Sequence, residues 1–379
     1  MKIQFNVSKS ALDAAASALS RVINPRAPIP VMSNILFRVQ GDTLHMRASD
    51  SEVTINTTVP LAGFPSTSEE CSFCAPATCL CSALEAISEQ MLTITVVREN
   101  SGEDGDNTMR IAHNTGETYF GVEGSDEYPM PAEAEYATTI TVRGDRLREA
   151  MRCTLWATGA DELRAQLCGV HLNSTPQGLD VVGTDGRALS RYTLKEVSGD
   201  CTATLPRNAV KTIMSVMGED DVTLSFSSTR GAARTGAYTV SFVLAEGAYP
   251  NYNAVIPRDT KRTSIANRDA LMGSIRRVSP FGNAASGLLT LIFSGNTLTM
   301  KGADTNYGYG AIDNASISFD GEATTIGVNG PMFQNVLSHI ESAEVFVKMS
   351  DPQRPVVITP AGNIPDTDIL MMAMPMRVD

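Results

Sequence analysis

The chain has 379 residues, a formal net charge of −12 at pH 7, 42% hydrophobic residues and 19% charged residues. This length predicts two or three domains, each large enough to bury its own core. No apolar run approaches the ~20 residues that a membrane-spanning helix needs, so we expect no membrane partner. The acidic balance argues against indiscriminate nucleic-acid binding, which usually requires a basic excess, but it is compatible with a local basic face.

The first third of the chain, residues 1–131, begins with a strand that leads into a helix over residues 8–22. The opening strand lacks the apolar region of a signal peptide, so we expect a cytoplasmic protein. Apolar residues recur in the helix at spacings of three and four, and Ser8 can cap its start. A second helical run follows at residues 77–87. Between the helices, alternating segments with polar turns predict an antiparallel sheet, with strands at residues 34–40, 43–46 and 51–59.

Two stretches of the first third resemble metal-binding patterns, and we interpret neither as a site. The acidic stretch 99–107 lacks the ligand spacing of a calcium loop, and we expect a solvated hairpin loop. Four cysteines are spaced C-x2-C and then C-x-C, at Cys71, Cys74, Cys79 and Cys81. The second pair is too close for the usual zinc geometry. We expect buried small side chains in a reducing compartment, with no metal and no cofactor.

The middle third, residues 132–257, has an unusually basic first helix at residues 143–157. Its outer face carries Arg146, Arg148 and Arg152, which in a single helix is ordinarily a solvated surface. A second helix, residues 208–217, is preceded by Arg207 and exposes Lys211. A strand pair is expected at residues 166–172 and 179–186, and it leads to residues 187–192. The turn Thr184-Asp185-Gly186 follows from its residue types, because Asp bonds nearby backbone and Gly admits positive φ.

The last third, residues 258–379, places Arg268, Arg276 and Arg277 on its first helix, and a second helix is expected at residues 331–340. The final strand, residues 368–374, is rich in methionine and runs into a short tail. The ordinary interpretation is a sheet strand with a tail. The alternative is the lip of a binding groove, because flexible methionine side chains adapt to several partners.

The three thirds repeat one pattern, which predicts three similar domains at residues 1–131, 132–257 and 258–379. Each begins with a strand that becomes a helix, at a leucine marker, Leu12, Leu147 or Leu271. A second leucine then stands six residues before an aspartate, at Leu44–Asp50, Leu179–Asp185 and Leu298–Asp304. Because the repeat length is that of a domain, we expect three domains and not a solenoid. The aspartates occupy turn positions, which favours a structural role for them.

The repeats, together with four short motifs, resemble the bacterial DNA polymerase III beta subunit, the sliding clamp family. The motifs are Arg26-Ala-Pro-Ile-Pro30, Thr184-Asp185-Gly186, the segment from Tyr249 to Pro257, and Met374-Pro-Met-Arg377. The resemblance covers the full length and implies an α+β fold of three clamp domains, each with antiparallel sheets outside and two helices inside. It also implies a head-to-tail homodimer, closed as a ring around double-stranded DNA without sequence preference, because phosphate contacts carry no sequence information.

The resemblance and the recurring basic helices together give ten candidate phosphate contacts. Arg26, Arg164 and Arg207 match family positions, and the others come from the equivalent helices. The full set is Arg26, Arg146, Arg148, Arg152, Arg164, Arg207, Lys211, Arg268, Arg276 and Arg277. Because the helices of the first domain are nearly neutral, we expect DNA to lean toward the second and third domains.

The family also implies a hydrophobic groove between the second and third domains for short motifs of the replicative polymerase, the clamp loader and other clamp-binding proteins. Apolar walls with one or two polar anchors suit such a groove. The matching positions are Leu167, Thr184, Gly186, Arg187, Leu189, Pro250, Tyr252, Val255, Met372, Met374, Pro375, Met376, Arg377 and Val378. This chain departs from the family pattern at Arg187, Ala188 and Ala254, so its preferred peptide is expected to differ. For ring closure, the family places Phe120 and Val122 near Phe281 of a neighbour.

Two other classes of function were weighed against a clamp. An enzyme is disfavoured, because the four histidines are scattered and no P-loop, Ser/His/Asp order or H-E-x-x-H motif occurs. A clamp paralogue or a peptide-binding scaffold with altered partners remains an alternative, since the sequence does not separate it from the replicative clamp.

Overall fold

The computed structural model describes residues 2–27, 29–63, 65–66, 70–98, 107–130, 134–362 and 364–378. The expected boundary at residues 131–132 and most of the acidic stretch 99–107 lie outside the described residues. No helix in the described part of the chain is long and apolar enough to cross a membrane. The fold is α+β, with strands that all pair antiparallel.

Three modules follow one another along the chain, and each has the element order β-α-β-β-β-β-α-β-β-β. The first consists of β1 (Lys2–Ser8), α1 (Lys9–Ser20), β2 (Asn34–Gln40), β3 (Thr43–Ser49), β4 (Val53–Pro60), β5 (Cys71–Pro76), α2 (Ala77–Ala86), β6 (Met91–Val97), β7 (Thr108–His113) and β8 (Gly116–Gly121). The second consists of β9 (Thr138–Arg143), α3 (Gly144–Leu155), β10 (Gly169–Thr175), β11 (Gly178–Thr184), β12 (Ala188–Leu194), β13 (Thr202–Pro206), α4 (Arg207–Val216), β14 (Asp221–Phe226), β15 (Arg230–Thr235) and β16 (Tyr238–Val243). The third consists of β17 (Arg262–Asn267), α5 (Arg268–Val278), β18 (Leu288–Ser294), β19 (Thr297–Asp304), β20 (Tyr309–Asp320), β21 (Thr324–Asn329), α6 (Gly330–Ser338), β22 (Glu344–Met349), β23 (Val356–Pro360) and β24 (Thr367–Ala373).

Strand pairing is the same in each module. In the first module β1 pairs with β6, then β7 and β8, while β5 pairs with β2, then β3 and β4. The second and third modules reproduce both sets with their own strands. Equivalent backbone hydrogen bonds also start the first helix of each module, from Lys9 N to Gln90 O, Gly144 N to Asp220 O and Arg268 N to Ala343 O. The repeat read from the sequence is therefore confirmed as a structural repeat.

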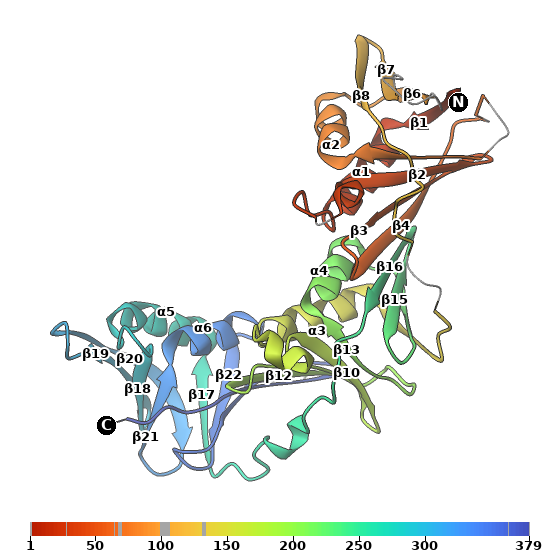
Figure 1. Ribbon diagram of the computed structural model, residues 1–379. Coiled ribbons are helices and arrows are strands. Elements are labelled where there is room, and N and C mark those ends of the chain that lie inside the picture. Colours follow the sequence, from red (N-terminus) through yellow and green to blue (C-terminus); the bar gives the residue numbers. More distant parts are fainter. Residues whose placement is uncertain are drawn as a thin grey trace. The chain divides into compact units, whose positions relative to one another are not determined.

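Strand pairing also joins consecutive modules. β4 of the first module pairs with β16 of the second, which gives an eight-stranded sheet, β5-β2-β3-β4-β16-β15-β14-β9. β12 of the second pairs with β24 of the third, within the twelve-stranded sheet β13-β10-β11-β12-β24-β23-β22-β17-β20-β19-β18-β21. We call these pairings the first and the second junction; both can be followed in Figure 1.

Because of these shared sheets, the chain has two compact units by internal contacts. Unit 1 comprises residues 1–145 and 208–244, and unit 2 comprises residues 146–207 and 245–379. The middle module contributes strands to both units. The three-domain boundaries therefore stay a prediction about the sequence repeat.

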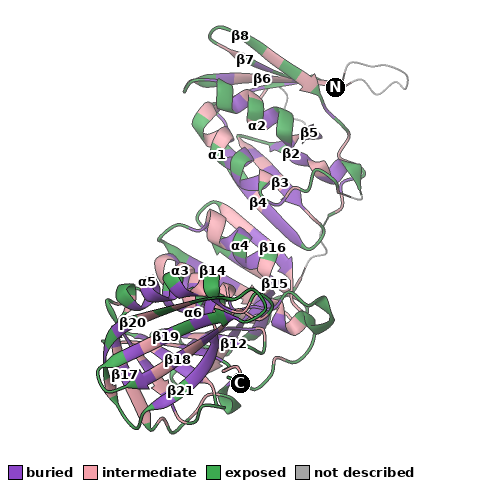
Figure 2. Ribbon diagram, turned by 90° about the vertical axis from the view of Figure 1, so that its left-hand side faces the viewer, coloured by how far each residue is buried: buried purple, intermediate pink, exposed green. Residues whose placement is uncertain are grey.

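The helices are amphipathic, with one face buried on the sheet. The leucine markers Leu12, Leu147 and Leu271 are fully buried, as are Leu44 and Leu179. Figure 2 shows the same division, since the helices carry both buried and exposed residues. This burial is the main source of helix stability, because isolated helices of about three turns are marginal in water.

The three marker aspartates each hold a turn, as the sequence predicted. Asp50 Oδ1 accepts hydrogen bonds from the backbone N–H of Glu52 and Val53, at 3.0 and 2.7 Å. Asp185 Oδ1 accepts from the two equivalent N–H groups, both at 2.7 Å. Asp304 accepts from Asn306 N at 3.0 Å and Ala284 N at 2.8 Å. Their oxygens are engaged by backbone, which supports a structural role.

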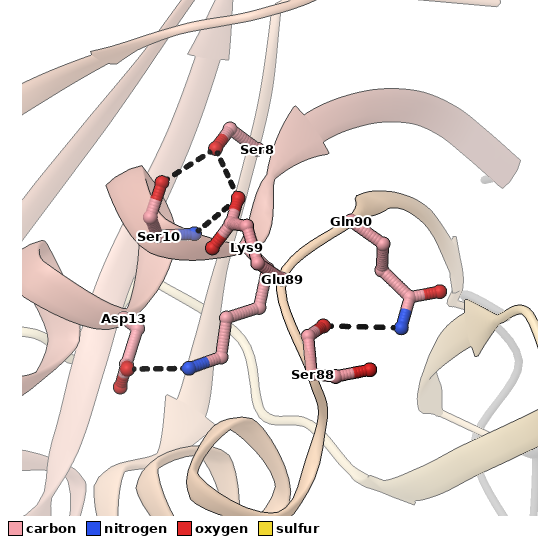
Figure 3. Close-up of polar contacts among 7 residues, drawn as sticks. All are labelled: Ser8, Lys9, Ser10, Asp13, Ser88, Glu89 and Gln90. Atoms are coloured by element: carbon pink, nitrogen blue, oxygen red, sulfur yellow. Dashed lines mark hydrogen bonds and ion pairs between the residues drawn. The ribbon is translucent and has the colours of Figure 1, made fainter.

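Three local predictions were wrong. Residues 166–167 belong to a 3-10 turn (Glu162–Leu167) and not to a strand. Ser8 precedes α1, but its side chain does not cap the helix; Glu89 Oε1 instead accepts from Ser10 N at 3.4 Å and Ser8 Oγ at 3.3 Å (Figure 3). A carboxylate serves this position because it complements the positive end of the helix dipole.

The third error concerns the four clustered cysteines. Cys71 and Cys74 are buried on β5, and burial raises their thiol pKa values to about 11 and about 12. Cys79, however, is exposed on α2. The prediction of a buried side chain was therefore wrong at Cys79, because this residue lies on the solvent face of the helix.

Candidate functional sites

The helices concentrate positive charge in the second and third modules. α4 carries Arg207 and Lys211 without a carboxylate, and α5 carries three arginines against Asp269. α1 has one cation, Lys9, whose Nζ lies 2.8 Å from Asp13 Oδ2 (Figure 3). α2 and α6 contain no Lys or Arg. A phosphate backbone would therefore meet its favourable field mainly on the later helices.

Carboxylates compensate four of the ten predicted phosphate contacts. Arg152 lies 2.7 Å from Glu341, and Arg164 lies 3.2 Å from Asp161. Arg268 contacts Asp269, and Arg277 pairs with Asp313. The hydrogen bond from Arg277 lowers the pKa of Asp313. Because the carboxylates of these pairs are partly exposed, phosphates can compete for the arginines at little cost.

The remaining six candidates differ in their contacts within the chain. Arg207 donates to Gly159 O at 3.3 Å, and Arg146 and Arg148 also interact within the chain. Three side chains form no ion pair or hydrogen bond within the described residues and are exposed: Arg26, Lys211 and Arg276. These three are the best placed for new phosphate contacts.

A buried apolar cluster at the second junction contains part of the predicted groove. Leu189, Tyr252 and Met372 pack together there with Val182 and Val357. The cluster lies over β11, β12 and β24, because these strands turn alternate side chains to one face. Three of the predicted groove residues, Leu189, Tyr252 and Met372, therefore lie together in this cluster.

A polar network anchors one wall of this cluster. The Tyr252 hydroxyl donates to the buried Asp180 Oδ2 at 2.7 Å and accepts from Asn173 Nδ2 at 3.0 Å. Thr193 Oγ1 donates to the other Asp180 oxygen at 2.6 Å. Burial raises the pKa of Tyr252 to about 12, so its proton stays available to the carboxylate. None of the sequence motifs contains Asp180. The repeat could have placed this residue on a strand, because it follows the marker Leu179.

The Thr-Asp-Gly turn sits at the end of β11. Thr184 Oγ1 donates to Ala188 O at 2.5 Å, and Gly186 has φ +87°, which favours glycine. Met374 N donates to Arg187 O at 2.8 Å, so the end of β24 is fixed against this turn. The side chain of Met374 is 40% exposed, as a groove lip requires.

The chain's last predicted groove residues lie along β21. Met376 N donates to Gly327 O at 2.8 Å. The segment 375–378 lines a cleft of about 580 Å³ with Gly327, Pro352 and Gln353. Leu167 is buried and Val255 is 50% exposed, while Pro250 is exposed. Among the fourteen predicted residues, Leu189, Tyr252 and Met372 lie in the apolar cluster, and residues 375–378 line this cleft.

The predicted subunit contacts lie on β8, directly after it, and in the 3-10 turn Ser279–Phe281. Phe120 is half-buried on β8, Val122 is buried, and Phe281 is 40% exposed. Three further exposed apolar residues were not among the predicted contacts, although Tyr119 belongs to the expected edge strand 119–122: Tyr119, Tyr307 and Ile312, at 64%, 70% and 67% exposure. Alternation along β20 was the available signal, since every second residue there is exposed.

The described residues contain no group of three or more metal-ligating His, Cys, Asp or Glu side chains. The buried His171 stacks on Tyr249 at 4.1 Å and bonds Thr204 Oγ1 at 2.9 Å. Burial lowers the pKa of His171 to about 4. His171 therefore serves as a neutral packing residue.

Three modules of this topology, joined by strand pairing, with cations gathered on the helices of an acidic chain, define a protein of the DNA-clamp class. Family profiles agree: the DNA polymerase III beta subunit N-terminal domain matches residues 3–108, and its C-terminal domain matches residues 253–377. The beta sliding clamp of Chlamydia muridarum is 26% identical over 387 residues and covers 99% of both chains. That of Synechocystis is 23% identical over 384 residues, with 96% of this chain and 97% of its own covered.

Solved structures show the same fold. The Pseudomonas aeruginosa sliding clamp bound to griselimycin has a TM-score of 0.91 at 21% identity, and the Thermotoga maritima beta subunit has 0.88 at 22%. Both matches cover 100% of each chain. The chain belongs to the bacterial DNA polymerase III beta subunit family, the sliding clamps. It is a DNA sliding clamp, a processivity factor without catalytic activity of its own.

Proposed function

We propose that two copies of this chain close head to tail around duplex DNA in the cytoplasm and tether the replicative polymerase during synthesis. The proposal that the ring closes rests on the junctions between consecutive modules. The first joins β4 to β16, the second joins β12 to β24, and the repeat makes β20 and β8 the equivalent third pair. Within the described residues, β8 pairs only with β7, and residues 309–316 of β20 pair only with β19.

A second copy would supply the missing partner strand at each end. Unpaired strand edges present rows of free N–H and C=O groups, and a head-to-tail dimer satisfies both edges at once. The exposed apolar residues Tyr119, Phe281 and Ile312 stand beside these edges, together with the Phe281–Tyr309 ring contact at 6.1 Å. The proposed interface thus adds Tyr119 and Ile312 to Phe120, Val122 and Phe281.

Sedimentation tests this closure. Ile312→Asp places a charge in the proposed interface and is expected to give monomers at concentrations where the unchanged protein is dimeric. Phe120→Ala and Phe281→Ala are expected to weaken the dimer in the same direction. Leu163→Asp is the matched control, because Leu163 is 94% exposed and belongs to the 3-10 turn Glu162–Leu167, not to β8 or β20. A dimer unaffected by Ile312→Asp would contradict the proposed pairing.

DNA would be held by phosphate contacts without base readout, so that the ring can slide. The unpaired cations Lys211 and Arg276 are expected to contribute most, and the compensated arginines less. The double variant Lys211→Gln with Arg276→Gln should shorten the lifetime of the loaded clamp on circular DNA and flatten its salt dependence. Removal of Arg146, Arg148 and Arg152 should act in the same direction. Lys195→Gln is the control, since Lys195 is exposed in the second module and lies outside its helices. Unchanged lifetimes in both sets of variants would refute the DNA-facing assignment.

The groove at the second junction would receive short motifs of the polymerase, the clamp loader and other DNA-handling partners. Met374→Ala tests the exposed lip at the end of β24, and Met376→Ala tests the cleft along β21. A peptide from the C-terminal region of the cognate polymerase should lose affinity in at least one of them. Peptide binding unaffected in both would place the motif elsewhere.

A clamp paralogue with altered partners is the second candidate, and the residues that favour it are Arg187, Ala188 and Ala254 in place of the family pattern. The deciding measurement is processive synthesis by the cognate polymerase on primed circular DNA after loading. Processive synthesis supports the replicative clamp, whereas loading without processivity supports the paralogue.

A further inference from the structure

A cationic pocket lies at the first junction, on strands β2, β3, β4 and β16. Its volume is about 250 Å³, and it is lined by Leu36, Arg38, Gln40, His45, Met46, Arg47, Asn56, Thr57, Thr58, Met130, Ala237 and Thr239. The lining contains two arginines and a histidine but no carboxylate. We call it the first-junction pocket.

Strand register identifies the position in the second module that is equivalent to the first-junction pocket, and there a side chain fills it. β10 and β11 begin at Gly169 and Gly178, 135 positions after β2 and β3 at Asn34 and Thr43. Arg38 stands opposite His45, and Asn173 opposite Asp180. His45 stands opposite Thr58, and Asp180 opposite Thr193. The two sets of side chains therefore occupy equivalent positions on equivalent strands.

In the second module the Tyr252 hydroxyl enters this position. It lies 2.7 Å from Asp180 and 3.0 Å from Asn173, and Tyr252 itself is 5% exposed. The first module has His45 in place of Asp180, Arg38 in place of Asn173 and Arg47 in place of Val182. The second module thus has a carboxylate, Asp180, that accepts a hydrogen bond from the Tyr252 hydroxyl. The first module has the donors Arg38 and Arg47 and the ring of His45 at the equivalent positions, around an open cavity.

In the described part of the chain, the side chains that accept from the Arg47 guanidinium are neutral. Its Nε donates to Asn56 Oδ1 at 2.5 Å, and Nη1 lies against the Met130 sulfur. Burial lowers the pKa of Arg47, and Arg38 acts in the same direction. Arg38 pairs with Glu70, whose side chain is 43% exposed, so that carboxylate is readily exchanged for another. A half-buried cation beside a second cation favours an incoming anion.

The dimensions favour a single anionic side chain over a nucleotide, because sites for whole small molecules usually have about 300–1,000 Å³. A second cleft, of about 160 Å³, shares Met130 with the pocket and is lined by one carboxylate, Glu52, and by Pro129, Arg230 and Ser241 among others. An extended segment can therefore continue from one into the other. We propose that the first-junction pocket binds an acidic peptide segment, with one carboxylate held between Arg38 and Arg47.

Methyl NMR of the full-length protein tests the proposal, with methionine methyl groups labelled. Met130 is 62% exposed and reports on the pocket, and Met91 on β6, 51% exposed, reports on nonspecific effects. Capped tetraglutamate, capped tetraglutamine and inorganic phosphate are titrated separately at constant ionic strength. Tetraglutamate is expected to shift the Met130 resonance saturably and to leave Met91 unchanged, while tetraglutamine gives no saturable shift.

Two variants make the test specific to the arginines. Arg38→Asn with Arg47→Val installs the residues of the second module and is expected to weaken tetraglutamate binding on the order of tenfold or more. Arg38→Gln changes only an exposed side chain, so it gives a result even if the double variant does not fold. Arg110→Gln should bind as the unchanged protein does. Equal shifts with tetraglutamine, or unchanged binding in Arg38→Gln and the double variant, would overturn the proposal. A saturable shift with phosphate but not with tetraglutamate would overturn it in favour of a small-anion site.

Discussion

His171 should make unit 2 less stable in mild acid. Its ring is 6% exposed, stacks on Tyr249 and bonds Thr204, and burial lowers its pKa from the usual 6.5 to about 4. Between these two values the unfolded chain binds a proton that the folded chain does not. Stability therefore falls as the pH decreases from about 6.5 to about 4, and no further loss from this group occurs below the folded pKa.

The size of the effect follows from the two pKa values. At pH 5 the unfolded imidazole is almost fully protonated and the folded one is not, which costs about 2 kcal/mol relative to pH 7. For a urea dependence of about 1–3 kcal/mol per molar, the unfolding midpoint should move by about 1 M. The substitution His171→Phe keeps an aromatic ring on Tyr249 and removes the titrating group. It should remove most of this pH dependence, whatever its own stability at pH 7.

The assay uses the single tryptophan of the chain, Trp156, which lies in unit 2 and stacks on His339 at 5.5 Å. Its fluorescence follows urea unfolding of unit 2 at pH 7 and pH 5 in the unchanged protein and in His171→Phe. His113→Phe is the control, because His113 lies at the β7–β8 turn of unit 1. A midpoint shift between the two pH values that is the same in His171→Phe as in the unchanged protein would refute the reasoning.

Three further predictions concern unit 2 and the cysteines. Tyr252→Phe leaves the buried Asp180 without one of its two hydroxyl donors, so unit 2 should lose about 2 kcal/mol in the same urea assay; no loss would mean that water replaces the hydroxyl. Gly183→Ala would bring a Cβ within 2.1 Å of Thr154 O, which should cost on the order of 3 kcal/mol, and an unchanged midpoint would show that the helix can shift. Cys79 should react with a thiol reagent in the folded protein, whereas Cys74 and Cys153, with thiol pKa values raised to about 12 by burial, should react only after unfolding; mass spectrometry of labelled peptides decides.

Most of the fold was readable from the sequence because it repeats. Leucines at fixed distances from turn aspartates marked equivalent strands three times, and a repeated pattern is hard to produce by chance. Local propensity failed where tertiary contacts decide the outcome. Glu89 reaches the start of α1 from a distant loop, and no local rule would have preferred it to Ser8. The pairing of β4 with β16 and of β12 with β24 was also invisible, since the sequence does not specify which strand edges meet.

The candidate sites were predicted less evenly than the fold. Motif matching gathered Leu189, Tyr252 and Met372 correctly into one cluster, because all three stand on elements that the repeat places. The cationic helices were identified by composition alone, but composition could not show that Arg152 and Arg277 already face carboxylates. Those pairings join residues far apart in the sequence, and only the packed structure reveals them.

One module thus provides two junctions with different chemistry, and the strand geometry explains how. Inward positions on the strands must stay apolar to bury the helices, whereas positions on the other face do not pack against the helices. The outward set is Arg38, His45 and Arg47 at the first junction and Asn173, Asp180 and Val182 at the second. The first set leaves a cationic cavity, and the second is closed by Tyr252. Since the pairing of β4 with β16 and of β12 with β24 rests on backbone hydrogen bonds, these side chains are free to diverge while the junction itself is kept.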